Sequence, residues 1–224
     1  MDEESESLIL GTLLAVSGGL MDAYSYILRG HVFANAQTGN ILFLGISLYS
    51  GQWQQVLHYL FPVAGFTAGI FISEIMHQSR LHPVHWKQTI LVFEAILLLL
   101  VPFIPLDLFA NSLTSFVCGM QVQTFRKLRG HPFATTMCIG NLRSGTVSLV
   151  SWLNDRQHHH LRAAGAYYYV IFCFVAGAVI GNALAPIAGL FTITGCTALL
   201  ILSWIVLHFQ HRNRQTAMEE LDQF

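Results

Sequence analysis

Six long stretches of the chain are apolar and almost free of charge, and this limits the folds open to it. They cover residues 8–28, 56–76, 88–106, 108–125, 163–185 and 187–209. A bilayer core about 30 Å thick needs about 20 such residues in a helix. Charged residues make up only 10% of the chain, against about 25% in a typical soluble domain. The sequence therefore predicts an all-α integral membrane protein with at least six transmembrane helices.

Six spans leave little of the 224 residues for anything else. We expect a single membrane domain over 1–224, with short tails at 1–7 and 210–224. The first tail is acidic, whereas a cleavable signal begins with basic residues, so no signal is expected. The four cysteines lie in apolar segments without a CxxC pair and are interpreted as small buried hydrophobes.

The chain also contains one unit twice. The RGHVFA run from Arg29 returns as RGHPFA from Arg129. The Gly-Asn pair at 39–40 returns at 140–141, and a VAG run followed by glycine at 63–69 returns at 175–181. We expect two repeats, at about 8–106 and about 108–209. A duplicated apolar unit that carries a polar motif is typical of membrane transporters.

Two further segments, 33–50 and 133–153, are more polar, and they either cross the membrane or re-enter from one side. Cytoplasmic loops collect Lys and Arg. With Arg143 set aside, eight spans divide the other ten basic residues six to four, whereas re-entrant segments leave only Arg29 opposite the other nine. We therefore expect six transmembrane helices plus two re-entrant half-helices. Both termini are then cytoplasmic, and the two three-span repeats are inverted.

The two polar motifs are the candidate solute site. Small polar residues suit a helix start, and a half-helix N-terminus offers free N–H donors and partial positive charge to an anionic or polar solute. The alternatives are ordinary helix caps with Arg143 at an interface and, for the two glutamines, interhelical hydrogen bonds. The predicted substrate-binding residues are Asn35, Gln37, Thr38, Gly39, Asn40, Gln121, Gln123, Thr135, Thr136, Gly140, Asn141 and Arg143.

Two carboxylates inside predicted spans, Asp22 and Glu94, are candidates for carrying a coupling proton, since ionisable residues within the membrane are functional by default. The alternative for Asp22 is a position near the outer interface, paired with Arg29. GxxxG faces at 65–69 and 177–181 predict close helix packing, within the chain or in a homo-oligomer.

Other classes of function find little support. The histidines at 158–160 are consecutive and unsuited to one ion, and there is no HExxH, so no metal is expected. P-loop and nucleophile-elbow motifs are absent, so we expect neither an enzyme nor a cofactor. A net charge of −1 without a basic stripe argues against nucleic acid.

Several runs in order resemble the YoaK-like family of uncharacterised bacterial multi-span membrane proteins. They are GLMDA from Gly19, FANAQTGN from Phe33 and CGMQVQ from Cys118. The resemblance covers roughly 8–209 and implies an inner-membrane protein, but it implies no substrate. Ile139 departs from it, because threonine is expected there by analogy with Thr38. If Thr38 contacts a solute, the second copy has lost that contact.

The leading hypothesis is a secondary transporter of a small polar or anionic solute, with its site between two facing re-entrant motifs at the membrane midplane. Two alternatives stay open, a passive channel built from the same motifs and a non-transporting membrane scaffold or assembly protein. The expected partners are the solute and the lipid bilayer.

Overall fold

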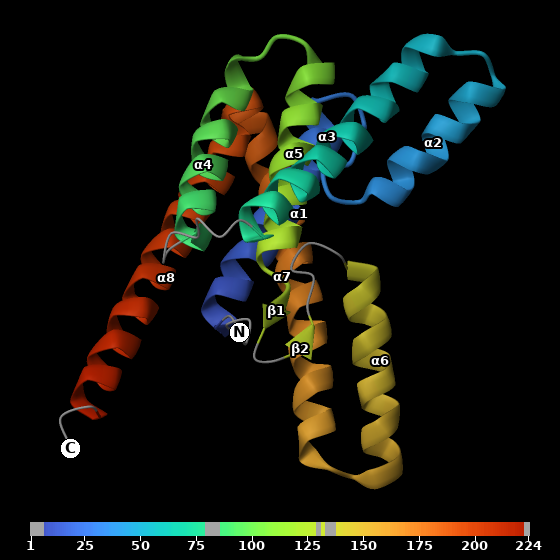
Figure 1. The fold of residues 1–224 in the computed structure, drawn as a ribbon. Coiled ribbons are helices and arrows are strands. Elements are labelled where there is room, and N and C mark those ends of the chain that lie inside the picture. Colours follow the sequence, from blue (N-terminus) through green and yellow to red (C-terminus); the bar gives the residue numbers. More distant parts are fainter. Residues whose placement is uncertain (1–6, 79–85, 129–130, 133–137, 222–224) are drawn as a thin grey trace.

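The computed structural model describes residues 7–78, 86–128, 131–132 and 138–221. These residues are almost entirely helical, which confirms the all-α prediction (Figure 1). Short 3-10 turns, η1 (Val101–Phe103) and η2 (Gly189–Ile193), follow two of the helices, and β1 (Lys127–Leu128) pairs antiparallel with β2 (His131–Pro132). The helices are α1 (Leu8–Leu28), α2 (Gln37–Tyr49), α3 (Trp53–Gln78), α4 (Trp86–Leu100), α5 (Asp107–Thr124), α6 (Cys138–Asp155), α7 (His158–Ala188) and α8 (Thr194–Leu221).

Four helical stretches within the described residues are long and apolar enough to cross a bilayer. They are Leu8–Leu28, Trp53–Gln78, Trp86–Phe103 and His158–Gln210, the last of which holds α7 and most of α8. The first coincides with the first predicted span. Helix α5 covers the predicted span at 108–125 but is not among the four, because it carries a row of buried polar side chains such as Asn111 and Gln121.

Helix α2 is too short to cross a membrane. Its 13 residues give a length of about 20 Å, against a hydrocarbon core of about 30 Å. Three of its large apolar side chains, Ile41, Leu42 and Ile46, are more than half exposed. Figure 1 shows the α2–α3 turn at the top and the α6–α7 turn at the bottom.

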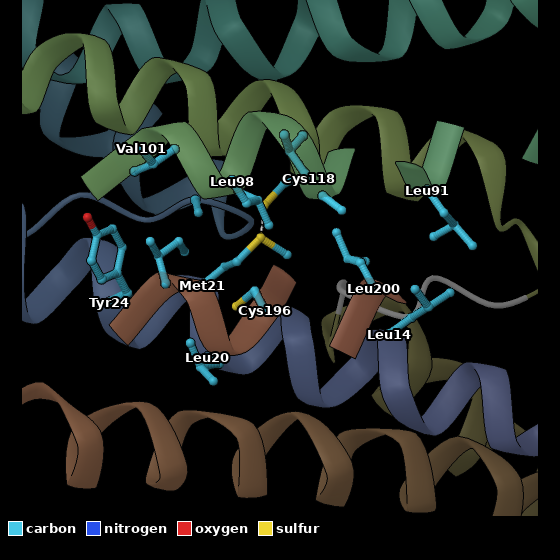
Figure 2. Close-up of a cluster of buried hydrophobic side chains, with 14 of the residues drawn as sticks. Leu14, Leu20, Met21, Tyr24, Leu91, Leu98, Val101, Cys118, Cys196 and Leu200 are labelled. Atoms are coloured by element: carbon cyan, nitrogen blue, oxygen red, sulfur yellow. Dashed lines mark hydrogen bonds between the residues drawn. The ribbon is translucent and has the colours of Figure 1, made fainter. Parts of the chain in front are cut away.

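Three helix pairs each join one helix from the first half of the chain to one helix from the second half. Helix α1 packs along α7, and α5 packs along α3, while α4 packs against α8. Between α1, α4, α5 and α8 lies a cluster of buried side chains that includes Leu14, Met21, Leu98 and Cys196 (Figure 2). The thiol of Cys118 donates to the sulfur of Met21 over 3.5 Å. The core is therefore shared by both halves.

Glycines set the close approach of the two crossed helix pairs. A Cβ added to Gly19 on α1 would lie less than 3.0 Å from the Phe174 carbonyl on α7, a separation that real Cβ atoms essentially never show. A Cβ added to Gly119 on α5 would likewise lie less than 3.0 Å from the Phe66 carbonyl on α3. The matched glycines of the two repeats thus make equivalent contacts, and the predicted small-residue packing is present within one chain.

The sequence match aligns Gly177 with Gly65. The structural match between the repeats is shifted from this alignment by four residues, or one helical turn. A Cβ on Gly177 would strike the carbonyl of Val16, and a Cβ on Gly69 would strike the carbonyl of Phe116. Val16 and Phe116 are equivalent, since each lies three residues before a glycine matched between the repeats. Gly69 is therefore the structural counterpart of Gly177. A four-residue shift keeps a helix face unchanged, so the sequence pattern did not distinguish the two glycines.

Candidate solute site

The first polar motif is folded onto itself by its own amide side chains. The Phe33 N–H donates to Asn40 Oδ1 over 3.1 Å, and Asn40 Nδ2 donates to the Phe33 carbonyl over 2.7 Å. Asn40 Nδ2 also reaches Gln37 Oε1, and Gln37 Nε2 donates to the Ala34 carbonyl over 2.7 Å. Of the predicted solute contacts, Asn40 and Gln37 thus fix the shape of the loop, while Thr38 is exposed.

Asp22 lies against this loop from the interior of α1. Its Oδ1 accepts the Asn35 N–H over 2.7 Å, and the N–H groups of Ala34 and Ala36 also point toward it. We call these three peptide N–H groups, at 34–36, the amide cradle. Asn35 Nδ2 donates to the Gly18 carbonyl over 3.1 Å, which fixes the loop to α1. The candidate N–H donors of the first motif therefore face a carboxylate that belongs to the chain.

Arg29 forms an ion pair with Asp107 rather than with Asp22. Its guanidinium bonds Asp107 over 3.0 Å, the Tyr24 hydroxyl over 2.8 Å and the Val101 and Ile104 carbonyls over 2.9 Å. The alternative pairing of Asp22 with Arg29 is wrong. Burial acts to lower the pKa of Arg29, but the bonds to Tyr24 and Asp107 outweigh it and raise the pKa above its usual value. This cation joins the end of α1 to the α4–α5 turn.

The second motif is described only from the start of α6. Thr135 and Thr136 lie outside the described residues. Asn141 is buried, whereas Gly140 and Arg143 are exposed. Cys138, the first residue of α6, lies close enough to Asp22 for the carboxylate to act electrostatically on the thiol. The start of α6 therefore lies within electrostatic reach of Asp22.

The remaining predicted polar residues separate into two environments. Gln123 donates to Glu74 on α3, away from Asp22. Glu94 and Gln121 are fully buried, and none of their four side-chain polar atoms has a hydrogen-bond partner among the described residues. The Cys118 thiol lies within electrostatic reach of both Asp22 and Glu94. Helices α1, α4 and α5 thus each bury polar side chains within the apolar core.

The second repeat lacks a counterpart of the Asp22 carboxylate. Where the first repeat has GLMDA from Gly19, the second has GMQVQ from Gly119, so Val122 takes the place of Asp22. Within the described residues, no three His, Cys, Asp or Glu side chains are placed to hold a metal ion.

Comparison with known proteins places the chain in a family. Residues 10–206 match a family of proteins of unknown function, DUF1275. The chain belongs to this family. The transmembrane protein YoaK (UPF0700) of Bacillus subtilis strain 168 is 27% identical over 143 residues, which cover 59% of this chain and 63% of that protein, less than two thirds of its length. The resemblance to YoaK is thereby confirmed, and no solved structure matches. This DUF1275 member is a membrane protein with apolar helices long enough to span a bilayer.

Proposed function

We propose that this DUF1275 member is a secondary transporter of a small polar or anionic solute, coupled to protons through Asp22 or Glu94. The observation that carries the proposal is the position of Asp22. It lies inside a helix of membrane-spanning length, bonds the loop before α2 and acts on the start of α6. A carboxylate buried in a membrane-spanning helix and bonded to the loop before a short helix is typical of transporter sites.

The buried polar atoms support a site rather than a purely structural core. Unpartnered buried groups are costly, yet Glu94 and Gln121 leave four such atoms among the described residues, in a protein whose outer surface is strongly apolar. A solute or a proton that visits this region would satisfy them. A scaffold needs no such region, and this favours transport over the scaffold alternative.

We further propose that the six-span topology holds, with both termini on the cytoplasmic side of the inner membrane. Single cysteines at Gln52 and Gln157, in a variant without the four native cysteines, test it. Both positions are exposed, in the α2–α3 and α6–α7 turns. We expect Gln52→Cys to react with a membrane-impermeant maleimide in intact cells and Gln157→Cys to react only after permeabilisation. Reaction of both from the same side would indicate that the polar segments cross the membrane.

Transport itself is tested in proteoliposomes that contain a trapped pH indicator. Phosphate, sulfate, amino acids and carboxylates are added one at a time, and we expect at least one to move protons, unlike in protein-free vesicles. Asp22→Asn or Glu94→Gln should abolish this movement, because each variant removes a titrating carboxylate. Glu74→Gln, at the end of α3, is the matched control and should retain it. Solute flux that ignores the proton gradient would favour a channel, and absence of any flux would favour a scaffold.

A further inference from the structure

We propose that the amide cradle at 34–36 is the binding site of a small carboxylate anion, and that Asp22 occupies it as a built-in substitute until the solute takes its place. The inference deepens the proposed function and rests on it. It names the chemical class of the solute and gives Asp22 a role in binding that solute as well as in carrying the proton.

The fit of the cradle to a carboxylate is visible in the structure. An oxygen of Asp22 accepts the Asn35 N–H over 2.7 Å, and the Ala34 and Ala36 N–H groups converge on the same group. Oriented N–H groups of consecutive residues form an anion site. The Asn40 and Gln37 bonds to the loop fix this geometry without help from Asp22. The cradle is therefore shaped by its own residues, and Asp22 fills it.

A second observation is the side chain of Asn35. Its Oδ1 is buried and has no hydrogen-bond partner among the described residues, while its Nδ2 is bound to the Gly18 carbonyl. The orientation of the amide is thus fixed, and its side chain also hydrogen-bonds the Asp22 carboxylate. An amide group that bonds a carboxylate must do so through an N–H, so Asn35 adds a side-chain donor to the three peptide donors. The unpartnered Oδ1 of the same buried amide leaves Asn35 able to bond a further donor in this region.

Protonation connects the two occupants. When a proton from solution binds the Asp22 carboxylate, its charge is lost and its hold on the N–H groups weakens, so an anion can replace it. Among the described residues, the titratable groups within electrostatic reach of Asp22 are Cys118 on α5 and Cys138 on α6. Beyond Cys118 lie Glu94 on α4 and Cys196 on α8. The contacts given for α7 opposite this part of α1 are with small or apolar residues such as Ala178 and Gly181. One proton thus enters with each anion.

Chemical rescue tests the cradle directly. Asp22→Ala removes the built-in carboxylate, and we expect sodium formate, the smallest carboxylate probe, to raise the thermal midpoint of the purified variant. Relative to sodium chloride at equal ionic strength, the rise should be about 4 °C at saturating formate. The wild type should show a much smaller difference at neutral pH and a growing one as the pH falls. Glu94→Ala is the matched control, a buried carboxylate without a cradle, and should show no formate-specific rise.

The outcomes separate this inference from transport. If Asp22→Ala responds equally to formate and chloride, or if Glu94→Ala gains as much from formate, the cradle is not a carboxylate site. Should Asp22→Ala fail to fold, the isosteric Asp22→Asn carries the same test with the same criterion. Because the readout is thermal stability, rescue without any flux in vesicles keeps the cradle and rejects the transporter. Flux in vesicles without formate rescue would keep the transporter proposal and reject the cradle as a carboxylate site.

Discussion

Gly177→Ala is expected to destabilise the folded protein by about 3 kcal/mol. The added methyl group would lie less than 3.0 Å from the Val16 carbonyl of α1. A backbone atom cannot rotate away as a side chain does, so α1 and α7 would have to separate along their whole contact. That separation also loosens the fit at Gly19, whose neighbour is the Phe174 backbone.

The matched control lies on the same helix. Gly165 has no neighbouring atom within 4 Å of an added Cβ, so Gly165→Ala is expected to be neutral or to stabilise α7 by about 0.5–1 kcal/mol, because alanine favours a helix interior. Unfolding of both variants in mixed detergent and SDS micelles gives the comparison. Equal stability of the two variants would contradict the close packing of α1 on α7.

Arg29→Ala is expected to cost about 3 kcal/mol. The substitution removes charge-assisted hydrogen bonds to Tyr24 and Asp107 and leaves the Val101 and Ile104 carbonyls without their donor. Arg29→Lys should recover only part of the loss, because an ammonium cannot reproduce the planar fork of a guanidinium. The free energy of unfolding of each variant is the measurement.

An exposed arginine serves as the control for charge alone. Arg162 on α7 is exposed, and Arg162→Ala should change the free energy of unfolding by less than about 0.5 kcal/mol. An Asp107→Asn variant should lower stability by less than Arg29→Ala, since the other three bonds of Arg29 remain. If Asp107→Asn costs as much as Arg29→Ala, the ion pair, and not the set of four bonds, holds the α4–α5 turn.

The sequence predicted the helices well where apolar length alone decides them. The run at 8–28 became α1 with the same bounds, and the short apolar stretch after Asn40 became a helix of 13 residues. The glycine faces were also predicted, because small residues at four-residue spacing have few other uses in a membrane helix. Local pattern is sufficient in each of these cases.

The roles of the polar residues were harder to predict, because they depend on contacts across loops. Asn40 and Gln37 carry the donors and acceptors that a solute would use, yet both are bonded to the backbone of their own loop. Asp22 reaches Asn35 across 13 residues of chain, a distance at which no helical spacing applies. The sequence therefore located the polar loop but did not distinguish the side chains that fix its shape from the carboxylate that it bonds.

The packing of α1 in the first half on α7 in the second half has a consequence for synthesis of the protein. Gly19 finds its neighbour on α7 only when Phe174 has left the ribosome. At about 5–20 residues per second, α1 therefore waits on the order of ten seconds with its narrow glycine face open to lipid. Helix α5, by contrast, meets α3 almost as soon as it is made. Helix α7 in the second half thus completes the packing of α1 in the first half. A chain released early would leave α1 without the helix on which it packs.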